Sequence, residues 1–215
     1  SWWSNEPMVY VMRKEGNAGA GDWVNDWSPT DIDTYDEAKV QVFSNCDEVE
    51  LFLNDVSLGV QPRTSDNASP RNWSFTFHTG TLKAVAKNNG TIVASQVLKT
   101  AGVPAKILLT VDKTKVANNW DDVSYISATV VDENGIPCLN ADNQITFSVS
   151  GAGFLAATDN GDLSSTESFL SNKRFCFKGR CIAAVKANAA GGKISITASS
   201  EKLKSATVEI EAVEK

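Results

Sequence analysis

Alternation of apolar and polar residues runs through most of the chain, and it restricts the possible folds more than any other feature. The alternation is clear in residues 49–53 and 73–77, and again in 124–131 and 144–149. A period of two places every second side chain on one face, so these segments are predicted to be strands with one buried face. No segment of about ten or more residues has the spacing of an amphipathic helix. The sequence therefore predicts an all-β fold.

Turn signals and chain length together indicate two domains. Strand-like runs alternate with turns about every 8–12 residues, which is typical of β-sandwiches, and Asn89-Gly90 is a strong hairpin signal. With 215 residues the chain is long enough for two sandwiches of roughly 100 residues each. Pro104 stiffens the short connection between the halves. We therefore predict two tandem immunoglobulin-like β-sandwiches, the first over residues 1–101 and the second over residues 102–215.

The charge and hydropathy of the chain exclude two classes of partner. The net charge is −6 and the pI is about 4.9, whereas a surface that binds DNA or RNA needs clustered lysine and arginine. No run of about 18 apolar residues is present that could span a membrane. We therefore expect no nucleic acid and no membrane span. Because the chain opens at Ser1 and enters a strand-like run almost directly, we expect it to be part of a longer protein.

The polar residues predict no metal site, cofactor or catalytic centre. His78 is the only histidine, and the cysteines lack the spacing of a zinc site. No glycine-rich nucleotide motif or nucleophile elbow occurs. Asp121-Asp122 and residues 159–162 carry oxygen ligands suited to calcium, but neither has a calcium-loop spacing, so 159–162 is interpreted as a turn. Glu48 and Glu50 alternate with apolar residues, which favours a solvated strand face over a glycosidase carboxylate pair.

The six tryptophans are the one feature with binding character. Trp73 alternates with Phe75 and Phe77 and is expected in a core. Trp120 lies in a polar run and is predicted to be exposed, where its ring could stack on the apolar face of a sugar. It is the candidate carbohydrate-binding residue. For the remaining tryptophans, which lie near a domain start, packing in a core or against a neighbouring domain is favoured over a sugar platform. The domain interface is the place predicted for all four: Trp2, Trp3, Trp23 and Trp27.

Two cysteines are predicted to face each other across a hairpin. Cys176 and Cys181 flank Lys178-Gly179, which would form a two-residue loop with Phe177 opposite Arg180. Directly opposed residues lie about 4.5–5.5 Å apart, within the range of a disulfide. The alternative is a pair of reduced, partly buried thiols that pack as small hydrophobic groups. Both alternatives stay open, and Cys46 and Cys138 are expected to be unpaired.

Several ordered motifs resemble the domains that follow the catalytic barrel in family 2 glycoside hydrolases. In the first half they are residues 47–54 (Asp-Glu-Val-Glu-Leu-Phe-Leu-Asn), 57–59 (Ser-Leu-Gly), 80–86 and 98–102. In the second half the motifs are residues 104–107, 130–132, 140–147, 159–162 and 195–200. The motifs cover nearly the whole chain. Asn54-Asp55 stands where the family pattern often has Asn-Gly, so this turn is expected to be less tight.

The resemblance implies that the parent protein is a β-galactosidase-like glycosidase, commonly bacterial and exported. Its catalytic glutamates would lie on a (β/α)₈ barrel upstream, and no position here matches them, so this part of the chain is not expected to be an enzyme by itself. The upstream barrel is then the expected partner, with a glycan and oligomerisation through the parent as further candidates. A periplasmic or secreted location is also implied.

Three functions are therefore possible for the chain. The first is a non-catalytic accessory region that buttresses the barrel, shapes substrate access or mediates oligomerisation. The second is a carbohydrate-binding module, and the third is a cell-surface immunoglobulin-like spacer or adhesin. The ordered family motifs favour the first.

Overall fold

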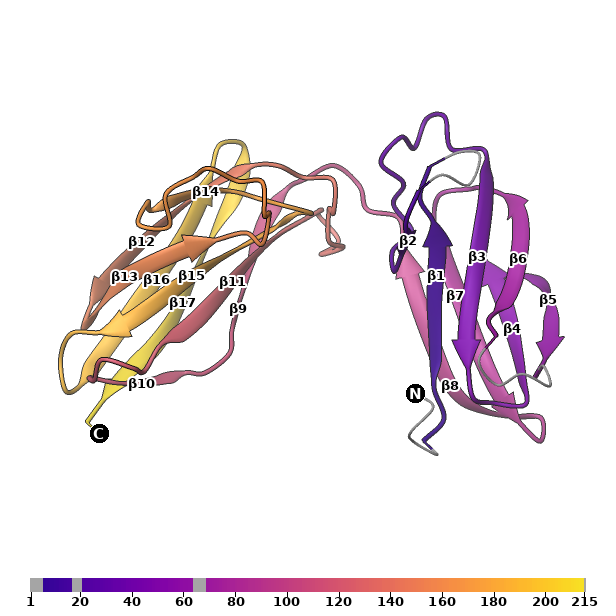
Figure 1. Cartoon of the computed structure of the whole chain (residues 1–215), viewed down its shortest axis with the longest axis horizontal. Coiled ribbons are helices and arrows are strands. Elements are labelled where there is room, and N and C mark those ends of the chain that lie inside the picture. The colour runs from indigo at the N-terminus through magenta and orange to yellow at the C-terminus, as the bar shows by residue number, and fades with distance from the viewer. Residues whose placement is uncertain (1–5, 17–20, 64–68, 215) are drawn as a thin grey trace. The chain divides into compact units, whose positions relative to one another are not determined.

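The computed structural model describes residues 6–16, 21–63 and 69–214, and these form strands joined by turns (Figure 1). The prediction of an all-β fold is confirmed. Within these ranges no helix has the length and apolar character needed to cross a bilayer. The chain divides into two compact units, Ser1–Thr100 and Ala101–Lys215.

The first unit contains two antiparallel sheets of four strands each. Sheet A has the strand order β2-β1-β3-β6 and sheet B the order β5-β4-β7-β8. Their bounds are β1 Val9–Lys14, β2 Trp23–Val24, β3 Glu37–Ser44, β4 Glu48–Leu53, β5 Val56–Pro62, β6 Arg71–Thr76, β7 Thr81–Asn88 and β8 Thr91–Lys99.

A single core lies between the two sheets. Alternation along β3 turns Val40 and Val42 toward it, and Leu51 of β4 and Leu82 of β7 reach it from sheet B. Full burial of a side chain of this size contributes about 1.5–3 kcal/mol. Trp73 is also in the core, as its alternation with Phe75 and Phe77 predicts.

The second unit is one nine-stranded sheet whose two halves share a core. The strand order is β13-β15-β11-β9-β17-β16-β12-β14, with β10 beside β17. The halves join at β9 and β17, through the parallel pair Lys106 and Lys204. The bounds are β9 Lys106–Val111, β10 Lys115–Ala117, β11 Ser124–Val131, β12 Gln144–Gly151, β13 Gly153–Asp159, β14 Lys173–Phe175, β15 Arg180–Ala187, β16 Gly192–Ser200 and β17 Leu203–Val213.

Inward-facing residues from both halves of this sheet form the second core. Ile126 of β11 and Val185 of β15 come from one half, and Phe147 of β12 and Ile196 of β16 come from the other. Because every second residue of β12 and β16 points inward, the residues between them form an outward face. That face, on the half made of β17, β16, β12 and β14, is called the outer face of the second unit below.

Two hairpin turns of the first unit can be compared with the turns predicted from the sequence. Asn89 and Gly90 have φ of 50° and 76°, as a two-residue hairpin turn requires, and this prediction is confirmed. Asn54 and Asp55 also have positive φ, 49° and 64°, and Leu53 pairs directly with Val56. The expectation of a less tight turn is therefore wrong: an Asn-Asp pair forms the same two-residue turn without glycine.

Candidate functional site

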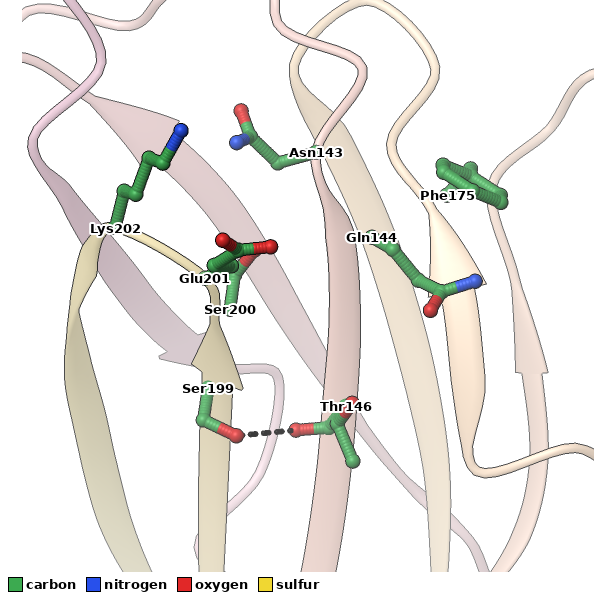
Figure 2. Close-up of a pocket in the computed structure, with 8 residues that line it drawn as sticks. All are labelled: Asn143, Gln144, Thr146, Phe175, Ser199, Ser200, Glu201 and Lys202. Atoms are coloured by element: carbon green, nitrogen blue, oxygen red, sulfur yellow. Dashed lines mark hydrogen bonds between the residues drawn. The ribbon is translucent and has the colours of Figure 1, made fainter.

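A groove of about 500 Å³ crosses one end of the outer face of the second unit (Figure 2). It lies where β12 begins, where β14 ends and where β16 turns into β17. Its lining combines amide, hydroxyl, charged and aromatic side chains. The lining residues are Asn143, Gln144, Thr146, Phe175, Ser199, Ser200, Glu201 and Lys202.

Strand register places the lining residues next to one another although they are far apart in the sequence. Gln144 of β12 is directly opposite Phe175 of β14, and Thr146 is directly opposite Ser199 of β16. Because Ile145 points into the core, its neighbours Gln144 and Thr146 face outward. The Ser199 hydroxyl donates to the Thr146 carbonyl oxygen at 3.5 Å.

The turn between β16 and β17 forms the other wall of the groove. Ser200 pairs with Leu203, so Glu201 and Lys202 are its two central residues, and Lys202 has a φ of 62°. Both side chains are exposed. Figure 2 shows Asn143 and Gln144 between this turn and Phe175. The groove therefore has opposite charges on one wall and an aromatic ring on the other.

The aromatic wall is fixed through the backbone of Phe175. The Glu167 carboxylate accepts a hydrogen bond from the Phe175 N–H at 3.2 Å, and the Asn160 amide donates to the Phe175 carbonyl oxygen at 2.9 Å. Glu167 is in turn held by the buried guanidinium of Arg174, 3.6 Å away. The ring of Phe175 remains 48% exposed. A rigid backbone thus presents a half-exposed ring to the groove.

Arg174 organises the long loop that leads to β14. Its guanidinium, 1% exposed, donates to the carbonyl oxygens of Thr158 at 2.8 Å and Ser168 at 2.9 Å. It also lies 5.5 Å from the centre of the Phe169 ring. These contacts tie the loop to the end of β13, because Thr158 belongs to that strand. No sequence motif indicated this role of the loop.

Trp120 is exposed, as predicted, but it is not part of this groove. Its side chain is 87% exposed on the loop between β10 and β11, and its carbonyl oxygen accepts a hydrogen bond from Lys186. A role of Trp120 in sugar binding stays a prediction.

The four tryptophans expected at a domain interface differ in position. Trp2 and Trp3 lie outside the described residues. Trp27 is fully buried in the core of its own unit, against Phe77 at 5.0 Å, and its indole N–H donates to the His78 carbonyl oxygen. Its ring therefore has no surface left for a neighbouring domain. Trp23 is partly exposed on the short strand β2, with the Lys14 ammonium 5.4 Å from its ring, and its interdomain role stays a prediction.

The predicted hairpin around the two cysteines is present. Phe177 and Arg180 exchange backbone hydrogen bonds of 2.9 and 3.1 Å, and Lys178 has the positive φ that this register requires. Cys176 and Cys181 are buried free thiols in this structure. A hydrogen bond with Cys176, together with burial, raises the pKa of Cys181. The two thiols are therefore in contact.

The acidic residues considered above as metal ligands or catalytic carboxylates lie in turns or form ion pairs. The carboxylate of Asp159 accepts from the N–H groups of Asn160 and Gly161, so the interpretation of 159–162 as a turn is confirmed. Glu50 pairs with Lys87 at 3.0 Å on the outward side of β4. Asp122 pairs with Lys113. Within the described ranges, no three His, Cys, Asp or Glu residues gather in a way that could hold a metal ion.

Both parts of the chain match family models of known proteins. Residues 107–209 match the family model described as glycoside hydrolase family 2 C-terminal domain 5, and residues 36–94 match a domain of unknown function, DUF4982. The β-galactosidase BoGH2A of Bacteroides ovatus is 39% identical over 172 residues, which is 80% of this chain. A putative β-glucuronidase of Formosa agariphila is 26% identical over 75% of the chain.

Solved structures agree with these matches. A family 2 glycosyl hydrolase from Bacteroides cellulosilyticus aligns with 99% of this chain at 30% identity and a TM-score of 0.89. A β-glycosidase from Bacteroides vulgatus aligns with 98% at 30% identity and a TM-score of 0.84. The chain spans about a fifth of BoGH2A, and 29% and 25% of these two structures. The chain therefore belongs to the C-terminal region of the family 2 glycoside hydrolases.

Proposed function

We propose that this chain is a non-catalytic accessory region of a β-galactosidase-like family 2 glycosidase, and that it buttresses the catalytic barrel of its parent. The outer face of sheet B in the first unit is the observation that carries this proposal. There Val60, Ile92 and Val97 are 47%, 64% and 45% exposed. Soluble monomers rarely expose such apolar groups together without a partner.

The strand register places these apolar residues on one surface. Val60 and Val85 are the two neighbours of Glu50, Val97 is opposite Lys83, and Ile92 is opposite Lys87. Val85 points away from the core, yet it is only 4% exposed. A groove of about 240 Å³ surrounds it, lined by Glu50, Phe52, Asp55, Lys83, Val85, Lys87 and Ile92.

The catalytic barrel of the parent protein is the proposed partner that covers this face. BoGH2A, of which this chain spans 20%, has room for a catalytic domain outside the aligned part. The Lys87–Glu50 ion pair lies within the face, so a partner that covers it leaves neither charge without its counter-charge. A periplasmic or secreted location, oligomerisation through the parent and the immunoglobulin-like form of both sandwiches belong to the same proposal.

The test uses the parent chain with this region present. We expect Ile92→Asp combined with Val97→Asp to lower its thermal inactivation temperature by several degrees, because a charge would be buried in the interface. The kcat below that temperature should stay within about twofold, since the substituted face binds no substrate. Leu163→Asp is the matched control, because Leu163 is fully exposed in the second unit. Equal inactivation of all three proteins would contradict the proposal.

A second measurement addresses the absence of catalysis. The 215-residue chain alone should not hydrolyse an aryl β-galactoside above the uncatalysed rate, because the acidic runs analysed above are engaged in turns and ion pairs. Turnover that disappears on substitution of one Asp or Glu of this chain would overturn the assignment.

A further inference from the structure

We propose that the groove on the outer face of the second unit binds a neutral saccharide chain. The proposal rests on the lining residues alone and holds whether or not the first unit docks on a catalytic barrel. Its volume of about 500 Å³ lies within the usual range of small-ligand sites, about 300–1,000 Å³. Its open form suits an oligosaccharide that passes across the strands (Figure 2).

The aromatic wall supplies the apolar contact that a sugar ring requires. One face of a pyranose carries axial C–H groups, and these pack against an aromatic ring. Phe175 is suitable because its ring is half-exposed while hydrogen bonds from Asn160 and to Glu167 hold its backbone on both sides. A platform fixed in advance loses little conformational freedom when a ligand binds.

The polar lining supplies hydrogen bonds in the pattern that sugar hydroxyls use. A carboxamide both donates and accepts, so it can bind two neighbouring hydroxyl groups of one ring. Figure 2 shows the amide of Gln144 on the side of the Phe175 ring, and the amide of Asn143 directed toward the turn that carries Glu201 and Lys202. No hydrogen bond or ion pair joins the side chains of these four polar residues to any other part of the chain that the structure describes. They are therefore free to bind a ligand.

The charge of the lining selects a neutral ligand. Glu201 and Lys202 are neighbours with opposite charges, so the groove offers no net attraction to an anionic chain such as a polyuronide. The remaining lining groups are amides, hydroxyls and one ring, which suit neither a hydrophobic helix nor a lipid tail. Hydroxyl groups also continue along the outer face, where the Thr197 and Thr207 hydroxyls lie 2.8 Å apart.

The test is a titration of the isotopically labelled 215-residue chain, monitored by NMR, with neutral tetrasaccharides of β-linked galactose, glucose and xylose. We expect shifts of the backbone signals of Gln144, Phe175 and Lys202 with at least one of them, and a Kd of about 1 mM. Trigalacturonic acid serves as the anionic comparison and should bind more weakly. Absence of shifts at about 10 mM of every neutral probe, or stronger binding of the uronide, overturns the proposal.

Matched variants identify the site. Phe175→Ala should weaken binding at least about tenfold, while Phe175→Tyr should retain it because the ring remains. Phe177→Ala is the control on the same hairpin, with a ring 40% exposed, and Trp120→Ala tests the separate exposed indole. Both should bind within about twofold of the unsubstituted chain. Loss of binding in Trp120→Ala with no change in Phe175→Ala would place the site elsewhere. Thermal unfolding of each variant confirms that it is folded.

Discussion

A β-carbon added to Gly80 would lie 2.0 Å from Oδ1 of Asn54. The Asn54 side chain is held there because it donates to the Thr79 carbonyl oxygen at 2.9 Å and accepts from the Thr81 N–H at 2.8 Å. These bonds fix Asn54 at a positive φ and tie the turn between β4 and β5 to the start of β7. They explain how an Asn-Asp pair forms a tight turn without glycine.

Gly80→Ala should therefore destabilise the first unit by about 2–4 kcal/mol, because it strains a residue at a φ of 127° and displaces the Asn54 side chain. Urea unfolding followed by tryptophan fluorescence measures the loss. Gly90→Ala is the control, since Gly90 also has positive φ but nothing lies within 4 Å of the added carbon. It should cost about 1 kcal/mol. Equal losses in the two variants would show that Asn54 moves freely.

The strands could be predicted from the sequence because each depends on local alternation. Val40 and Leu51, for example, are buried in the positions that a period of two indicates. The hairpin turn at Lys178-Gly179 was also predictable, because a two-residue loop places Phe177 opposite Arg180 and so sets the register of its own hairpin.

The groove could not be predicted because its residues meet only through long-range strand pairing. Gln144 and Phe175 are opposite each other although 30 residues separate them, and Glu201 comes from the turn between β16 and β17. The one local signal was the alternation of Phe175 and Phe177 with buried neighbours, which leaves both rings outward. Trp27 was misplaced for a similar reason: its position near a domain start gave no sign that Phe75 and Phe77 would cover it.

The buried carboxylate of Asp132 should make the second unit sensitive to acid. Burial raises the pKa of Asp132, but hydrogen bonds from the N–H groups of Gly102, Ile136 and Asn134 outweigh it, so the pKa is lowered. A lowered pKa adds stability above the unfolded value of about 3.9, and this stability is lost as pH falls through the folded value. Asp132→Asn should cost about 1–3 kcal/mol at pH 7 and much less at pH 2.

Asp142→Asn is the matched control for this prediction, because Asp142 is exposed. Urea unfolding of the three proteins between pH 7 and pH 2 tests it. A loss in Asp132→Asn that stays constant over this range would show that the carboxylate charge is not the cause.

The thiol of Cys138 should make the second unit less stable in alkali. Burial, with a smaller contribution from Asp132, raises the pKa of Cys138 to about 11. An unfolded thiol titrates near 8.5, so above that pH the unfolded chain loses a proton that the folded chain keeps. Stability should therefore fall between about pH 8.5 and 11. Cys138→Ala should show a smaller fall over the same range, and parallel profiles for the two proteins would contradict the prediction.

Arg174→Met should destabilise the second unit and release the loop that supports Phe175. The substitution keeps the apolar stem but removes the donors to Thr158 and Ser168, whose carbonyl oxygens would lose their charged partner. A cost of about 2–4 kcal/mol is expected, since Glu167 is partly exposed and can be hydrated after the change. Arg180→Met is the control, because Arg180 is exposed, and it should change stability by no more than about 0.5 kcal/mol. Urea unfolding measures both, and hydrogen exchange should increase over residues 163–172 only in Arg174→Met. Unchanged exchange in this segment would mean that Arg174 contributes to stability without holding the loop.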